Sequence, residues 1–278
     1  MKKTLIALAA LGVVGAASAQ VSISGGVAVG IQNTHTDSAA KFHLTNADIN
    51  FKASEDLGGG LMVNAGLGFS NEGTRGGSMG IENTTLAISG DFGKLSYGNI
   101  LSARAKMGSA SLETDLTDYL GGYLFVTVVQ YDAPAIGGWT PFVNWSKVQA
   151  TLTNTVGDLE VSGSPTIGIT GNVAGANVYL ENNTGNAADG WDLRVKYDAG
   201  GIGLAVRTTK DKYQEFGVSM PMGAMTVSVN TVSQNANKGT SLGVSYAMSK
   251  QTALTFGYGT GSGATSGQNY RLNLSKAF

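Results

Sequence analysis

The chain contains many short runs in which apolar and polar residues alternate. The clearest is DGWDLRVKYDAGG (189–201), where the odd-numbered residues from Trp191 to Tyr197 are apolar and the even-numbered residues between them are charged. After a short turn, the run from Ile202 to Arg207 repeats the alternation. Successive side chains of a β-strand point to opposite sides of the sheet. The pattern therefore predicts two neighbouring strands, each with one apolar and one polar face.

Alternating runs of about 8 to 12 residues recur along the chain from Val21 onward, separated by clusters of Gly, Asn, Asp and Ser. Together they predict about sixteen strands. An even number is what a closed antiparallel barrel with both chain ends on one side requires. The least regular stretch is 148–175, where Pro165 falls in the expected eighth strand and would remove a donor from the strand ladder. A bulge or an extracellular strand end would accommodate the proline; otherwise the strand count differs by one hairpin here.

The connections between these runs alternate in length. GDFG (90–93), AGG (199–201) and MSKQ (248–251) have the composition of tight turns. Longer polar connections lie between them: NTHTDSAAK (33–41), NEGTRGGSM (71–79) and GTGSGATSGQ (259–268). Short turns on one rim and longer loops on the other are typical of transmembrane β-barrels, whose turns are periplasmic and whose loops face outward.

The first residues have the pattern of a secretory signal peptide. Lys2 and Lys3 precede an apolar run from Leu5 to Val14, and Ala17-Ser18-Ala19 follows. The run is shorter than the roughly 20 apolar residues that a membrane-spanning helix needs. We expect cleavage after Ala19, so that residues 1–19 form the signal peptide and residues 20–278 form the barrel.

Composition excludes several classes of protein. The chain has no cysteine and a net charge of −1, which becomes about −3 when Lys2 and Lys3 are removed, so it offers no disulfide framework and no basic surface for nucleic acid. No stretch after residue 20 approaches 18 unbroken apolar residues, which excludes helical membrane spans. A bilayer offers no water to backbone groups, so a closed barrel is the remaining way to cross it.

Charge and aromatic placement agree with a barrel in lipid. Arg194, Lys196 and Arg207 all lie on the polar faces of their runs. This is expected, because Arg or Lys facing lipid at mid-depth costs roughly 2–4 kcal/mol. The aromatic residues near run ends are expected to form the interfacial girdles; they are Trp191, Tyr197, Tyr258, Tyr270 and Phe278.

Four stretches carry a family resemblance: SEDLGGGLMVNAGLGF (54–69), GDFGKLSYGNI (90–100), VVQYDAP (128–134) and the alternating end YRLNLSKAF (270–278). Together with the regular succession of alternating runs, these stretches make the chain resemble the general porins of Gram-negative outer membranes. The resemblance implies a water-filled channel through which small hydrophilic solutes and ions diffuse passively. It also implies a homotrimer in contact with outer-membrane lipid and lipopolysaccharide, and no cofactor.

The end of the chain resembles the signal by which the barrel-assembly machinery recognises its substrates. The apolar residues of this last alternating run are Tyr270, Leu272, Leu274 and Phe278. The final phenylalanine is the most specific of the features that carry the family resemblance.

One connection, 101–124, is longer and more polar than the others. The third long loop of porins folds into the barrel, so the resemblance places this segment at the pore constriction. Glu113, Asp115 and Asp118 would then line the constriction, with Arg104 and Lys106 near its mouth. Leucines at every fourth position from Leu112 predict a short helix packed on the wall, which favours the inward loop. The alternative is an extracellular loop with a solvated charge cluster.

The lumen wall is expected to carry charged residues from both halves of the chain; they are Asp48, Lys52, Arg75, Arg194, Lys196, Arg207 and Arg271. Charged groups around a narrow pore select ions by sign, and its diameter sets a size limit. In the porin family the wall arginines usually come from early strands. In this chain most of the arginines expected on the wall come from strands late in the sequence.

Three other functions are alternatives to a general pore. An enzyme on the barrel rim would need a catalytic group, but His35 beside Asp37 and Ser38 is best explained as a solvated loop histidine, and no cluster suits zinc. A substrate-specific channel would need a polar-aromatic track, for which Tyr179 and Tyr213 are the candidates. A non-conducting structural or adhesive barrel would have a plugged lumen.

Overall fold

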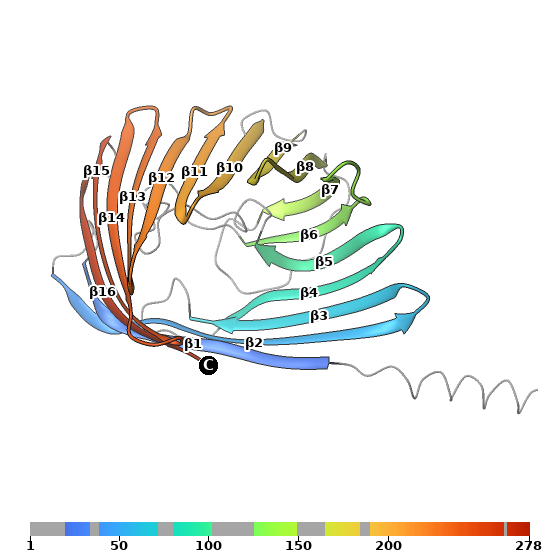
Figure 1. The fold of residues 1–278 in the computed structure, drawn as a ribbon, viewed down its shortest axis with the longest axis horizontal. Helices are drawn as coiled ribbons and strands as arrows, with labels where there is room; N and C mark the ends of the chain where they lie inside the picture. Colours follow the sequence, from blue (N-terminus) through green and yellow to red (C-terminus); the bar gives the residue numbers. More distant parts are fainter. Residues whose placement is uncertain are drawn as a thin grey trace, which may run out of the picture.

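The computed structural model describes residues 20–33, 39–71, 80–101, 125–148, 165–183, 190–263 and 266–278, which form one closed β-barrel. Its sixteen strands follow the chain in order (Figure 1): β1 Gln20–Asn33, β2 Lys41–Gly58, β3 Leu61–Ser70, β4 Gly80–Gly90, β5 Gly93–Leu101, β6 Phe125–Asp132, β7 Trp139–Val148, β8 Thr166–Val173, β9 Ala176–Asn183, β10 Trp191–Ala199, β11 Ile202–Thr209, β12 Gln214–Met222, β13 Met225–Gln234, β14 Asn237–Ala247, β15 Thr252–Ser262 and β16 Gly267–Ala277.

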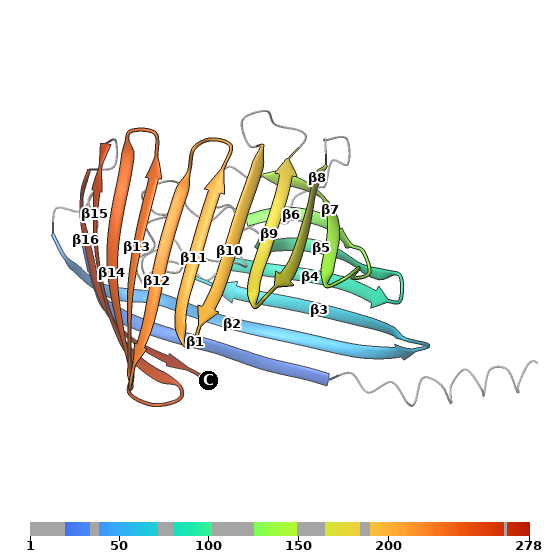
Figure 2. The same ribbon diagram turned by 45° about the horizontal axis from the view of Figure 1, so that its top comes forward.

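Every strand pairs antiparallel with the next one along the chain, and β1 closes the barrel by pairing with β16. Figure 2 shows β9 to β14 side by side with alternating directions. The predicted antiparallel barrel and its sixteen strands are confirmed. Among the described residues, no helix has the length and apolar character needed to span a membrane.

The outer face of the barrel is apolar. Leu86, Val206 and Leu272 expose 56%, 44% and 44% of their surface, and the other apolar residues of the alternating runs lie on the same side. Trp191 and Tyr197 lie outward at opposite ends of β10, as expected for two aromatic girdles.

The inner face is polar and much more covered. Its buried residues include charged and amide side chains, among them Asp192, Arg194, Glu215, Asn230 and Asn273. A soluble barrel would place its apolar side chains inside. This barrel has the opposite arrangement, which suits lipid outside and water inside.

The two rims differ as the sequence predicts. Two-residue turns join β2 to β3, β4 to β5 and β10 to β11 on one rim, where β1 begins and β16 ends. Tight turns are not confined to this rim, because on the other rim only Asn235 and Ala236 join β13 to β14. The positive φ of Asn235, 56°, suits this tight turn.

One expectation about strand boundaries was wrong. Within the stretch 259–268, residues 259–262 and 267–268 belong to strands rather than to a loop: Gly259 pairs with Asn269 and Thr260 with Gln268. Its glycines suggest a loop by composition, but β14 and β16 on either side supply the hydrogen-bond partners. Pro165 lies directly before β8, which begins at Thr166. The strand end therefore accommodates the proline, which is one of the two arrangements expected from the sequence.

The seam between β1 and β16 is fixed by the last residue. Phe278 donates its N–H to the carbonyl of Gly25 at 3.0 Å and accepts the Gly25 N–H at 3.2 Å. The Phe278 ring covers Gly25 so closely that a Cβ there would lie 2.7 Å from ring atom Cζ. The chain end is therefore part of the barrel closure.

Candidate functional site: the charged inner wall

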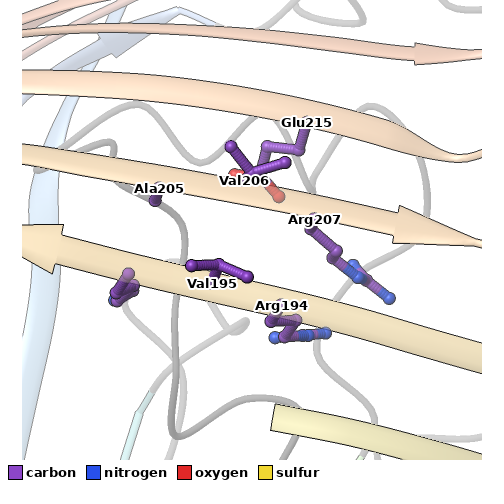
Figure 3. Close-up of a pocket in the computed structure, with 7 residues that line it drawn as sticks. Arg194, Val195, Ala205, Val206, Arg207 and Glu215 are labelled. Carbon is purple, nitrogen blue, oxygen red and sulfur yellow. The ribbon is translucent and has the colours of Figure 1, made fainter. Parts of the chain in front are cut away.

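The main charged cluster of the described inner wall lies on β9 to β13. Arg194 of β10 stands opposite Arg207 of β11 in the strand register, and Glu215 of β12 stands opposite Arg207 on the other side. Figure 3 shows the two arginine side chains together, with Glu215 on the next strand. These residues and Lys196 line a pocket on the wall.

Asp192 bridges the two arginines. Its Oδ1 accepts Arg194 Nε at 3.3 Å, and its Oδ2 accepts Arg207 Nη2 at 3.0 Å and Nε at 3.2 Å. Asp192 is only 1% exposed, and Arg194 is 7% exposed. Two like charges placed directly opposite on neighbouring strands repel, and the shared carboxylate offsets that repulsion.

Tyr213 holds Arg207 from the other side. The guanidinium carbon of Arg207 lies 4.4 Å from the centre of the Tyr213 ring, within the range of a cation–π contact. The Tyr213 hydroxyl donates to Glu215 Oε2 at 3.2 Å, and Asn230 Nδ2 donates to Glu215 Oε1 at 3.1 Å. Burial, and then the Glu215 carboxylate, raise the pKa of Tyr213, so the phenol stays protonated and keeps donating.

A second tyrosine extends the network toward β7. The Tyr179 hydroxyl donates to Glu181 Oε2, and the Tyr179 ring stacks on Phe142 with centroids 5.4 Å apart. Tyr179 also stands opposite Arg194 in the register of β9 and β10. Both tyrosines proposed for a polar-aromatic track are thus buried in hydrogen-bonded contacts with glutamates.

Asp48 and Lys52 lie on another part of the wall, on β2. The Asp48 carboxylate accepts Asn46 Nδ2 at 3.1 Å and Asn50 Nδ2 at 3.0 Å. Lys52 is exposed. Arg271 is on β16, where it pairs in register with Gln32 of β1 and Gly257 of β15.

The structure thus brings together three of the expected wall residues, Arg194, Lys196 and Arg207. Six predicted site residues lie outside the described residues: Arg75, Arg104, Lys106, Glu113, Asp115 and Asp118. The inward course of segment 101–124 likewise falls outside them, apart from Leu101 at the end of β5.

Sequence reasoning missed the roles of Asp192, Glu215 and Asn230. Alternation alone places all three on the inner face, and this was the only feature of the sequence that could have indicated their roles. Their contacts depend on register between strands, which alternation does not give. In the described part of the chain, no group of three His, Cys, Asp or Glu side chains is arranged to hold a metal ion.

The sequence model of the Gram-negative porin family matches residues 4–275. This match covers nearly the whole chain. The chain belongs to the Gram-negative porin family. It is therefore an outer-membrane channel for passive diffusion, and the channel interpretation of its polar lumen is confirmed. The proteins of this family and fold are non-enzymatic channels.

Solved porin structures share the fold. OmpF of Salmonella typhi, solved in complex with daunomycin, matches with a TM-score of 0.69 and 12% identity, covering 93% of this porin and 97% of that chain. A triple mutant of the Rhodopseudomonas blastica porin matches with a TM-score of 0.65 and 12% identity over 93% and 100% of the two chains. The anion-selective porin from Comamonas acidovorans matches with a TM-score of 0.60 and 17% identity, covering 94% of this porin and 100% of that chain. A search of curated proteins finds no match to this porin.

Proposed function

We propose that this porin is a general pore, in which size and charge rather than a dedicated binding site decide which small hydrophilic solutes and ions pass. The observation that carries the proposal is the polar inner face, which combines residues of both charge signs and neutral amides from many strands. A fixed ring of charge selects by sign, while lumen width sets the size limit.

The proposed determinants of passage are the wall charges and the third long loop. On the wall these are Asp48, Lys52, Arg194, Lys196, Arg207 and Arg271, together with Arg75. Glu113, Asp115 and Asp118 are proposed to face them at the constriction, with Arg104 and Lys106 at its mouth. The support for the loop residues is the family resemblance and the length of segment 101–124.

The working form is proposed to be a homotrimer of residues 20–278 after cleavage of the signal peptide at Ala19. The support is membership of the porin family, with NEGTRGGSM (71–79) as the segment that would latch onto a neighbouring subunit. Assembly is proposed to depend on Tyr270, Leu272, Leu274 and Phe278 as the signal for the barrel-assembly machinery. Lipid and lipopolysaccharide would contact the apolar outer face.

Conductance in planar bilayers tests the general pore. We expect large steps that rise with salt concentration without saturating, because ions cross a water-filled lumen without binding at one site. Saturation by one sugar or one anion would instead indicate a substrate-specific channel. Purified, folded protein that inserts but gives no conductance would indicate a non-conducting barrel and overturn the proposal.

A further inference from the structure

We propose that Asp192 is a selectivity-determining residue, which restrains the anion preference of the pore by neutralising two wall arginines. The inference rests on the proposed general pore. Asp192 was not among the wall charges expected from the sequence. Its position in the structure makes it the shared partner of Arg194 and Arg207.

Most of the charged side chains that line the pocket are cations. Three cations, Arg194, Lys196 and Arg207, line the pocket on β10 and β11, and among the described lining residues Glu215 is the one carboxylate. Asp192, which pairs with both guanidiniums, is nearly inaccessible, at 1% exposure. A passing ion therefore meets cations whose positive charge a hidden carboxylate has partly cancelled.

Asp192, rather than Glu215, forms the ion pairs with the two arginines in the described part of the chain. Glu215 stands opposite Arg207 in the register, yet its oxygens accept hydrogen bonds from Tyr213 and Asn230. Among the described residues, both arginines form ion pairs with Asp192. Loss of the Asp192 charge would thus affect two guanidiniums at once.

Arg207 has a second contact that does not depend on the Asp192 charge. Arg207 is packed against the Tyr213 ring, which keeps the guanidinium at the wall independently of Asp192. Asparagine has nearly the shape of aspartate and retains an oxygen that accepts from an arginine. The variant Asp192→Asn should therefore leave the cations in place with less of their charge balanced.

The test is the reversal potential of Asp192→Asn in planar bilayers under a KCl gradient. We expect the chloride-to-potassium permeability ratio to rise by about tenfold. One unit charge at about 6 Å in a medium like bulk water changes the local concentration of each ion about threefold, in opposite directions for chloride and potassium. The change should shrink as salt is raised, because added ions screen the wall. An unchanged ratio, or a shift toward potassium, would overturn the inference.

Two control variants separate charge placement from charge loss. Asp198→Asn removes the same formal charge from β10 at the turn rim, where Asp198 accepts the Gly201 N–H at 2.6 Å, and should leave the ratio nearly unchanged. Asp192→Glu keeps the charge, so its permeability ratio should stay near that of the wild type. An equal shift in Asp192→Asn and Asp198→Asn would show a general charge effect and overturn the specific role of Asp192.

A second variant keeps the inference testable if Asp192→Asn does not assemble. Arg194→Gln combined with Arg207→Gln leaves Asp192 without its two cations and should shift the ratio toward potassium. No shift in this double variant would contradict the inference. Failure of the wild type to conduct would be a different result, because it overturns the general pore itself.

Discussion

Replacing Leu86 with lysine should prevent stable insertion of the barrel or sharply destabilise it. Leu86 lies on the outer face of β4, is 56% exposed, and has apolar or aromatic register neighbours, Ala65 and Tyr97. A lysine facing lipid near mid-depth costs roughly 2–4 kcal/mol, a large share of the stability of an ordinary domain. Denaturant unfolding in lipid vesicles, followed by tryptophan fluorescence, measures the loss.

The matched control is Asn64→Lys on the neighbouring strand β3. Asn64 pairs with Ala87, the residue after Leu86, so the two lysines lie at almost the same height on opposite faces of the wall. Asn64 is exposed on the inner side, where a charge can be hydrated. Its variant should unfold near the wild-type denaturant concentration. Equal losses for the two lysines would mean that the outer face does not meet hydrocarbon.

Replacing Gly30 with alanine should disrupt closure of the barrel. A Cβ at Gly30 would lie 2.2 Å from the Leu272 carbonyl oxygen and 2.2 Å from Asn273 Oδ1, across the seam between β1 and β16. The carbonyl belongs to the strand ladder, so the strands must separate to admit the methyl group. Overpacking of this kind typically costs about 1–3 kcal/mol, and more when backbone must move.

Gly26→Ala is the control for the seam. Gly26 lies on the same strand and face, but a Cβ there would meet its nearest neighbours at 3.4 Å, an ordinary contact distance. The yield of the heat-resistant folded form on gels run without boiling measures closure. We expect Gly30→Ala to reduce this yield strongly and Gly26→Ala to leave it near wild type. Equal yields would show that the seam tolerates the added volume.

The strand plan could be predicted because it is a local property of the sequence. Each strand pairs with the next one along the chain, so alternation within a run and a turn after it, as at 191–209, specify both the strand and its partner. The same alternation gives the inward side of Arg194, Lys196 and Arg207. Lipid imposes this periodicity, because it penalises a charge on the outer face.

Contacts between charged residues could not be predicted, because they depend on register. Asp192 stands opposite Thr209, and Arg194 stands opposite Arg207, so the Asp192–Arg207 ion pair runs diagonally between β10 and β11. A shift of one residue in the turn at 200–201 would turn the side chains of one strand to the other face. The sequence alone contains the charges but not this alignment.

Glycine-rich strand ends were also difficult to predict from the sequence. Gly259, Gly261 and Gly267 have the composition of a loop, yet they pair with neighbouring strands. Barrel closure supplies partners to backbone groups regardless of side-chain propensity, so composition underestimates strand length there. The predicted constriction in segment 101–124 lies outside the described residues and stays a prediction.

The most direct test of the account is a spin-label scan along β3, from Met62 to Leu67, in lipid vesicles. The chain has no native cysteine, so single cysteines can be introduced one at a time and labelled. We predict that oxygen, which dissolves in lipid, reaches Val63, Ala65 and Leu67 best. A water-soluble nickel complex should reach Met62, Asn64 and Gly66 best. The absence of a two-residue alternation, or an alternation with the two probes exchanged, would contradict a barrel with lipid outside and water within.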